Sequence, residues 1–430
     1  MINNTQREKK SIYLNLIKNR TLMLLWSGQS ISIIGDAFFD LAVIWVVYSQ
    51  SQSVLQTAVI GALSHLSTAI FSLVAGTVAD RMNRKKVMVY TNVIASLVLF
   101  CVATIVLVFG YLPFSVALVS VLLLNILNTF LSPCEASIMP EIVGKEQLAT
   151  AYGIFSSIGQ TAALLGNAVA GVIIAGIGAG WSITIDAVTF MIVALLIGIA
   201  RIPKNKIYKS NSNKDKSFTF SLITDIKDGW NYIKLFPLIK TILWLYLMIN
   251  IISFMPPLYP ALVDQQLNGN ASVFGFIHVV SLIGGITGGL VTGSVVRKLK
   301  LKSIVGLLWI LAGLCTLGIS FSTFVPLTLF LMFGQTFFVS ISSIYLSTLQ
   351  MSIVSQEYRG RVWGIVRTFA IITMPVSTLI AGILGDIIGV PILFTAAGFW
   401  IILMGVFAGL NHHLRNAHIL EESVHKASSS

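Results

Sequence analysis

Two carboxylates lie one helical turn apart in an otherwise apolar stretch. They are Asp36 and Asp40 in SIIGDAFFDLAVIW, residues 32–45. Side chains four residues apart share one face of a helix, and neighbouring carboxylates in a low dielectric disfavour simultaneous ionisation. Such a pair could take up and release a proton, so the spacing predicts a proton-coupling site. The alternatives are that Asp36 only hydrogen-bonds a neighbouring helix and that Asp40 only reaches the outer interface.

Two further acids, Asp186 and Glu135, also fall within apolar runs. An ionisable side chain at the centre of a membrane helix costs roughly 2.5–3.5 kcal/mol on insertion scales, so each requires an explanation. We expect Asp186 to meet Asp40 and join the coupling site, although a structural bond to a partner helix explains it equally well. Glu135 would either attract cationic substrates at the cytoplasmic mouth or be a solvated acid at the interface.

Several polar or aromatic side chains within the apolar runs could line a substrate cavity. A small-molecule site is mostly apolar and has a few polar groups that fix orientation. The candidates, together with Glu135, are Trp45, Asn125, Asn128, Gln160, Asn250 and Gln335. They would suit a bulky, partly apolar ligand.

Motifs for enzymatic chemistry are missing from the sequence. It has no Gly-x-x-x-x-Gly-Lys-Ser/Thr loop for phosphates and no Gly-x-Ser-x-Gly nucleophile turn. The three cysteines, Cys101, Cys134 and Cys315, are far apart, and no His, Cys and carboxylate cluster has the spacing of metal ligands. We therefore expect no enzyme, no cofactor and no metal.

The elements that position these residues are membrane helices. The 430 residues are 56% hydrophobic with a mean hydropathy of +0.87, and about 20 apolar residues cross a bilayer. A polar segment, residues 201–238, separates two sets of six spans and includes a predicted amphipathic helix over residues 218–233. We predict an all-α fold with bundles at 1–200 and 239–411 and a tail at 412–430. The twelve spans are predicted at 22–48, 54–78, 87–109, 114–138, 149–177, 181–200, 239–263, 272–296, 303–323, 326–350, 362–388 and 391–411.

The net charge of +12 is explained by membrane topology. If the first helix enters from the cytoplasm, every Lys and Arg falls in a cytoplasmic loop, tail or helix end. The opposite loops then hold a single charge, Asp264. The positive-inside rule accordingly predicts that both termini are cytoplasmic, and we expect no nucleic-acid partner.

The two halves resemble each other in sequence. IVGKEQLATAYGI at 142–154 matches IVSQEYRGRVWGI at 353–365 at an offset of 211 residues, and GTVADRMNRKK at 76–86 weakly matches GSVVRKLKLK at 293–302 at an offset of 217. Loop-length changes would account for the small difference between the offsets. The repeat predicts two parallel six-helix halves, as in transporters with an axis along the membrane normal.

The loop GTVADRMNRKK resembles a signature of the major facilitator superfamily. Gly76, Asp80, Arg81 and Arg84 match that signature, and Asn83 stands where a second glycine is usual. Within the superfamily, the segments SPCEASIMPEIVGKEQLATA, ITIDAVTFMIVALLIGIARIPK and EYRGRVWGI are similar to macrolide-efflux and siderophore-exporter proteins of the drug:proton antiporter group. The resemblance implies alternating access and a bacterial plasma membrane.

The acid in this loop suggests a gate. Asp80 at the carboxyl end of its helix faces the negative end of that helix's own dipole, which is unfavourable. We predict that it binds the amino end of the eleventh span, at residues 360–362, and closes the cytoplasmic side. The predicted gate comprises Gly76, Asp80, Arg81, Arg84 and Arg361.

The predicted function is proton-coupled export of hydrophobic or amphipathic compounds by a monomer in the lipid bilayer. Two alternatives remain within transport: a dedicated exporter of a siderophore or lipid-like metabolite, and an importer. A third alternative is a scaffold or sensor that transports nothing. The carboxylate pair argues against a scaffold, which would gain nothing from the cost of inserting it.

Overall fold

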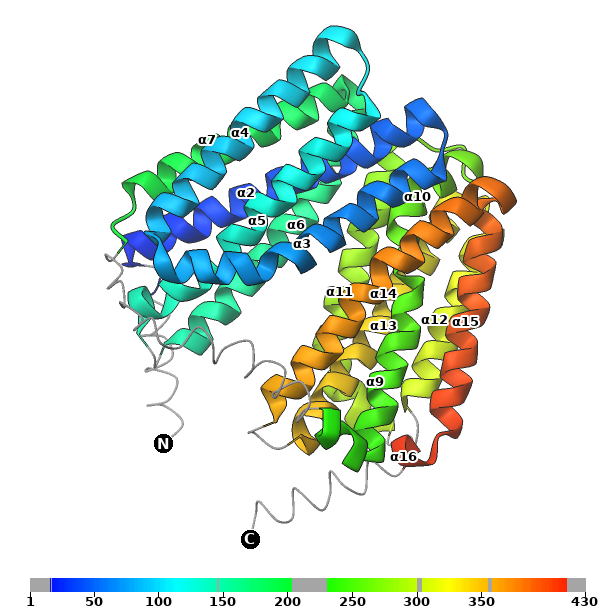
Figure 1. Ribbon diagram of the computed structural model, residues 1–430. Coiled ribbons are helices and arrows are strands. Elements are labelled where there is room, and N and C mark those ends of the chain that lie inside the picture. The colour runs from blue at the N-terminus through cyan, green and yellow to red at the C-terminus, as the bar shows by residue number, and fades with distance from the viewer. Residues whose placement is uncertain are drawn as a thin grey trace. The chain divides into compact units, whose positions relative to one another are not determined.

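The computed structural model describes residues 16, 18–144, 147–202, 230–299, 304–354 and 358–415 (Figure 1). All regular secondary structure in these ranges is helical. Within these ranges, eleven segments are helical, long and apolar enough to cross a membrane, and in α14 the stretch Thr373–Ile388 is a shorter apolar helix. The predicted all-α membrane fold is confirmed.

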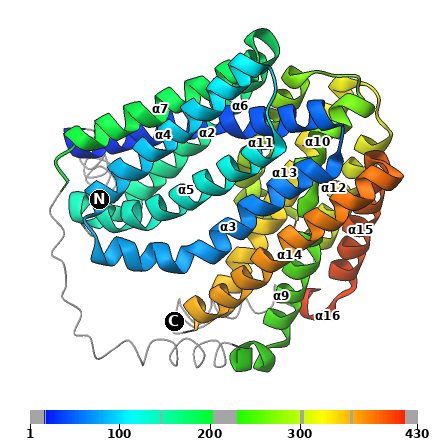
Figure 2. The same ribbon diagram turned by 45° about the horizontal axis from the view of Figure 1, so that its top comes forward.

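One compact unit, unit 1, is built mainly from the first six spans. It comprises α2, α4 to α7, α3 from Leu63 onward, and residues 270–276 at the start of α11. Both views show α4 lying beside α7, and α2 packs against α6 and α7 (Figures 1 and 2). The helices are α2 (Arg20–Ser51), α3 (Val54–Arg81), α4 (Arg84–Phe109), α5 (Phe114–Val143), α6 (Leu148–Ile177) and α7 (Ala179–Ile199).

The other compact unit, unit 2, contains the remaining spans and the first turns of α3, residues 53–62. Helix α12 packs along α13 and α15. The helices are α9 (Pro237–Ile249), η1 (Asn250–Phe254), α10 (Met255–Gln265), α11 (Ala271–Leu299), α12 (Ile304–Phe321), α13 (Val325–Ile353), α14 (Arg359–Ile388), α15 (Val390–Leu410) and α16 (His412–Arg415). Each unit thus includes the first turns of a helix that continues in the other, and the predicted bundle boundaries stay a prediction.

Two glycines mark the repeat in three dimensions. Gly178 joins α6 to α7 at φ 92°, and Gly389 joins α14 to α15 at φ 86°. A positive φ favours glycine because it has no Cβ. The two turns are separated by the same 211 residues that relate the two sequence segments, so the internal repeat extends to backbone geometry.

The seventh span is broken, whereas the sequence predicts one continuous helix over 239–263. Helix α9 passes into the short 3₁₀-helix η1 and then into α10. Pro256, Pro257 and Pro260 lack the backbone N–H groups that a continuous α-helix needs at these positions. One carbonyl near the break has a side-chain partner, since Trp400 Nε1 donates to Met248 O at 2.9 Å.

The predicted amphipathic helix over 218–233 lies mostly outside the described ranges. Residues 230–235 are helical. Within unit 2, Ile233 is buried with Ile239 and Val362, and Tyr232 stacks on Tyr358 with ring centroids 4.4 Å apart. The end of this segment is therefore packed against α9 and α14.

Candidate functional site

The most enclosed acid of the candidate site lies where α7 crosses α2 in unit 1. Asp186 is 1% exposed, and Thr189 Oγ1, one turn later on α7, donates to Asp186 Oδ1 at 3.0 Å. Gly35 on α2 leaves the space for both side chains, because a Cβ at Gly35 would clash with Thr189 Oγ1 and Asp186 Oδ1. Asp186 Oδ2 has no hydrogen-bond partner among the described residues.

Asp36 extends this crossing toward α5. It is half-buried, and the Asn128 side chain interacts with its carboxyl group. Asp40, Glu135 and Asp186 lie close enough to interact electrostatically with Asp36. Asp40 itself is exposed. The structure therefore brings together all three acids proposed for coupling, together with two of the cavity candidates.

The helices α2, α5, α6 and α7 carry no basic side chain beyond Arg20 that could neutralise these acids. The sequence has no Lys or Arg in residues 21–51, 114–143, 148–177 or 179–199, which form α2 after its first residue, α5, α6 and α7. Removing an unpaired carboxylate from water is costly, and a carboxyl group avoids that cost by holding a proton. Geometry and composition together suit the cluster to carrying protons.

The other cavity candidates of unit 1 make local contacts. Trp45 stacks on Phe274 with ring centroids 5.9 Å apart. Asn125 Nδ2 donates to Val121 O at 2.9 Å and to Ser64 Oγ at 3.3 Å. Gln160 is exposed, and its Nε2 donates to Ser156 Oγ on the same helix. Of these three residues, Gln160 is the exposed one, whereas Trp45 and Asn125 are half-buried.

Two cavity candidates lie in unit 2, on α13 and at the helix break. Asn250 Nδ2 donates to Tyr246 O at 2.7 Å and helps to end α9. Gln335 is 7% exposed, and its Oε1 has no partner within the described ranges. An unpaired buried amide oxygen is costly, which suits Gln335 to a hydrogen bond with a ligand or water.

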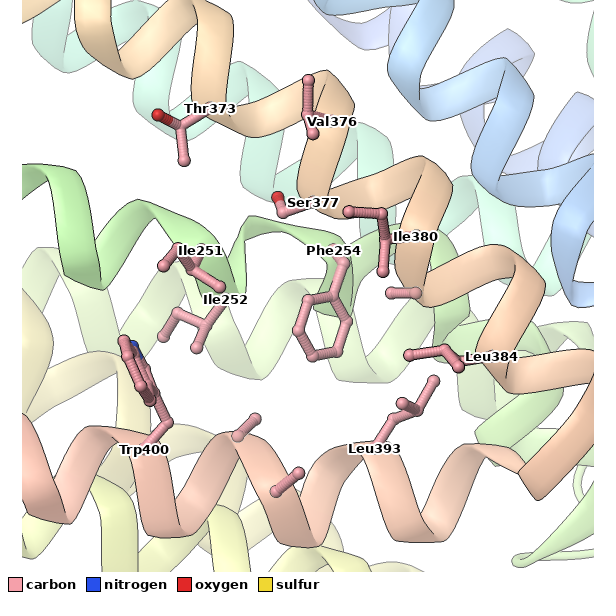
Figure 3. A pocket seen from close by; sticks show the side chains of 13 residues that line it. Ile251, Ile252, Phe254, Thr373, Val376, Ser377, Ile380, Leu384, Leu393 and Trp400 are labelled. Atoms are coloured by element: carbon pink, nitrogen blue, oxygen red, sulfur yellow. The ribbon is translucent and has the colours of Figure 1, made fainter.

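A pocket of about 570 Å³ lies in unit 2 between η1, α14 and α15 (Figure 3). Its lining is apolar except for Thr373, Ser377 and the indole N–H of Trp400, which already donates to Met248 O. Two of its lining residues, Val376 and Ile380, are 53% and 52% exposed. The sequence gives no sign of this pocket because the helix break that borders it was not predicted.

The predicted cytoplasmic gate is described only at Arg84. The structure does not describe the surroundings of the other four gate residues, Gly76, Asp80, Arg81 and Arg361. Arg84 Nη1 pairs with Glu141 Oε1 at 2.7 Å and donates to Ser137 O at 3.4 Å, so it ties the start of α4 to the end of α5. Next to it, Lys85 Nζ donates to Gly198 O and Ala200 O at the end of α7.

Asn83 explains the departure from the loop signature. Its side chain accepts the Lys86 N–H at 3.1 Å and so caps the amino end of α4. Asparagine is among the best residues at such a cap. The position that usually holds glycine is therefore occupied by a residue with a structural role of its own.

The ion pair between Arg84 and Glu141 supports a prediction. Glu141 is 36% exposed at its side chain, and pairs of this kind contribute roughly 0.2–1 kcal/mol. We expect Arg84→Ala and Glu141→Ala each to lower the thermal stability of the purified protein only slightly. If Arg84 also serves the gate, Arg84→Ala will reduce transport more than Glu141→Ala does. Equal transport rates would limit Arg84 to the ion pair.

The chain is similar to known proteins over nearly its whole length. A family model described as transmembrane secretion effector matches residues 13–428. Macrolide efflux protein A of Streptococcus pyogenes is 24% identical over 405 residues, 91% of this chain and 96% of that protein. The multidrug efflux pump Tap of Mycolicibacterium fortuitum is 24% identical over 409 residues, 93% of this chain and 97% of the relative. The staphyloferrin A transporter of Staphylococcus aureus is 24% identical over 407 residues, covering 93% and 98%.

Solved structures support the fold. A bacterial homologue of the human lysosomal transporter Spinster, in an inward-facing and unoccupied conformation, is similar with a TM-score of 0.72 at 12% identity, covering 93% of this chain and 98% of that one. The nucleoside transporter NupG is similar with a TM-score of 0.71 at 12% identity, covering 91% and 98%. At these identities the likeness concerns the fold alone.

Proposed function

Because the chain belongs to the transmembrane secretion effector family of major facilitator transporters, we propose that it exports hydrophobic or amphipathic small molecules in exchange for protons. The family makes it a multi-pass membrane transporter and not an enzyme. The proposal goes further in naming direction, cargo and coupling ion. The observation that carries it is the group of Asp36, Asp40 and Asp186 on two crossing helices without a basic residue on those helices beyond Arg20.

The proposed coupling uses the unequal surroundings of these acids. Asp40 is exposed and can exchange protons with water, Asp36 is half-buried, and Asp186 is fully buried. A carboxyl group in low dielectric changes charge only when water or a counter-charge reaches it. In this mechanism, alternating access changes the exposure of Asp36, which binds a proton from one side and releases it to the other.

The proposed cargo rests on two independent supports. Relatives are named for macrolide efflux and multidrug efflux, and the unit 2 pocket is apolar with a few hydroxyl groups, as expected for a lipophilic ligand. A second candidate is a dedicated siderophore exporter, favoured by the relative named as a staphyloferrin A transporter. For either cargo we propose a monomer in a bacterial plasma membrane with both termini in the cytoplasm.

A transport assay tests this function. Liposomes that contain the purified protein would be loaded with a lipophilic cationic dye or a macrolide. The movement of this compound across the membrane would be followed after a pH jump that makes one side acidic. We expect movement against the substrate gradient that stops when nigericin removes the pH gradient. Transport that persists undiminished without a pH gradient would contradict proton coupling. Transport of a siderophore, with no transport of any lipophilic compound, would favour the second candidate.

A further inference from the structure

The amino end of α3 receives a carboxylate from a distant part of the chain. Asp386, near the end of α14, accepts hydrogen bonds from Ser53 Oγ at 2.8 Å, from the Val54 N–H at 2.5 Å and from the Leu55 N–H at 3.2 Å. All these residues belong to unit 2. A negative charge there satisfies free N–H groups and complements the positive end of the helix dipole.

Close packing accompanies these hydrogen bonds. A Cβ at Gly385 would lie 2.7 Å from Val54 Cγ1, and one at Gly382 would clash with Ala58 Cβ. The end of α14 therefore lies directly against the first two turns of α3, as glycines permit where helices approach closely in membranes. The contact therefore combines a charged cap with close packing at two glycines.

Asp386 supplements a cap that helix α3 already has. Ser53 Oγ already accepts the Gln56 N–H at 3.3 Å, which is a regular cap by a residue of the helix's own chain segment. The matching helix of the second repeat, α11, is capped in the same way, since Asn270 Oδ1 accepts the N–H groups of Ser272 and Val273. At the repeat offset of 211, the position equivalent to Asp386 is Ala175. The borrowed carboxylate is thus an addition found in one repeat only.

The place of this contact on α3 gives it a mechanical consequence. Residues 54–62 of α3 belong to unit 2 and the rest of the helix belongs to unit 1. If the units move relative to each other, either α3 bends or its first turns separate from α14. The sequence of α3 has no proline at which it would bend.

We propose that Asp386 is a latch that holds the first turns of α3 against the end of α14 and must release them once in every transport cycle. This inference rests on the proposed alternating-access function. It concerns the side of the membrane opposite to the predicted gate at Asp80, because the end of α14 and the start of α3 adjoin the loops predicted to be outside. Because the other repeat lacks such a latch, the equivalent helix contacts of the two repeats would not separate equally easily.

Distance measurements test the latch directly. Spin labels at Gln56→Cys and Ile387→Cys, in a background without the three native cysteines, would report the separation of α3 and α14 without substrate or pH gradient. We expect Asp386→Asn to raise the ratio of separated to closed molecules at least about tenfold, which corresponds to about 1.4 kcal/mol, because hydrogen bonds to a charged acceptor are stronger than those to an amide. Asp264→Asn, which removes a negative charge and leaves the α3 cap intact, should leave the ratio unchanged. An unchanged distribution in Asp386→Asn would overturn the latch.

A reversible cross-link provides a second measurement that does not depend on the stability of Asp386→Asn. A Cβ at Gly385 would lie 3.2 Å from Val54 Cβ, close to the separation of about 3.5–4.5 Å found in disulfides. We expect Val54→Cys with Gly385→Cys to stop transport when oxidised and to recover it with reductant. Transport at the unlocked rate in the oxidised protein would overturn the latch. If the distances between the spin labels shift as expected but dye transport does not depend on the pH gradient, the proposal of proton coupling fails and the latch stands.

Discussion

Asp36→Asn is expected to abolish uphill export while leaving downhill substrate exchange in place. Asparagine has nearly the same size and polarity as aspartate but cannot bind and release a proton. One proton that crosses 100 mV supplies about 2.3 kcal/mol, which sustains a roughly 50-fold substrate gradient. In liposomes with an imposed proton gradient, the variant should reach no accumulation beyond equilibration. Exchange of labelled for unlabelled substrate should continue.

Two neighbouring variants are the controls for this result. Asp40→Asn alters an exposed acid one turn away and should retain part of the uphill transport. Asn128→Ala removes the side chain that interacts with Asp36; it should shift the pH at which transport is half-maximal without eliminating coupling. If Asp36→Asn accumulates substrate as well as the original protein and with the same pH response, Asp36 has no coupling role.

The sequence predicts much of this arrangement because insertion into a membrane constrains it strongly. Runs of about 20 apolar residues and the cost of buried charge are both visible residue by residue. They locate the spans and single out Asp36 and Asp186 as acids that need an explanation. The spacing of Asp36 and Asp40 also depends only on local helix geometry, so their common location follows without any tertiary information.

The remainder depends on contacts between residues far apart in the chain. Thr189 is an ordinary hydroxyl residue until its position beside Asp186 is known, and the role of Gly35 appears only where α7 crosses α2. Asp386 similarly looks like an acid at a helix end, although it caps a helix that starts 332 residues earlier. Periodicity cannot show which helices cross or at which residues.

The broken seventh span has a different cause. Its signal, three prolines within five residues, is present in the sequence. The apolar composition of the segment nevertheless predicts one span, because hydropathy averages over about 20 residues and does not register missing N–H groups. Composition therefore locates a membrane helix well and its internal breaks poorly.

Gly35→Leu is expected to prevent stable folding, and Gly35→Ala to lower the melting temperature of the purified protein substantially. Even one methyl group at Gly35 would meet Thr189 Oγ1 and Asp186 Oδ1, and it would lie 3.0 Å from Thr189 Cβ. Overpacking of this kind typically costs about 1–3 kcal/mol. Displacing the Thr189 hydroxyl would add the loss of its hydrogen bond to Asp186, about 1 kcal/mol or more for a buried acceptor. Thermal unfolding in detergent, followed by size-exclusion chromatography, measures the effect.

Helix α2 offers a matched control two turns earlier. Gly28 also faces α7, but a Cβ there would lie 3.7 Å from Val193 Cγ1, an ordinary contact. Gly28→Ala should therefore be neutral or stabilise the protein by up to about 1 kcal/mol, since alanine favours helix more than glycine does. Thr189→Ala should partly rescue Gly35→Ala, because it removes the hydroxyl that the new methyl group meets. Equal melting temperatures for Gly28→Ala and Gly35→Ala would contradict the crossing described for α2 and α7. Thr189→Ala alone tests a second role: if this single variant folds but couples protons poorly, Thr189 positions Asp186 for proton exchange as well as for packing.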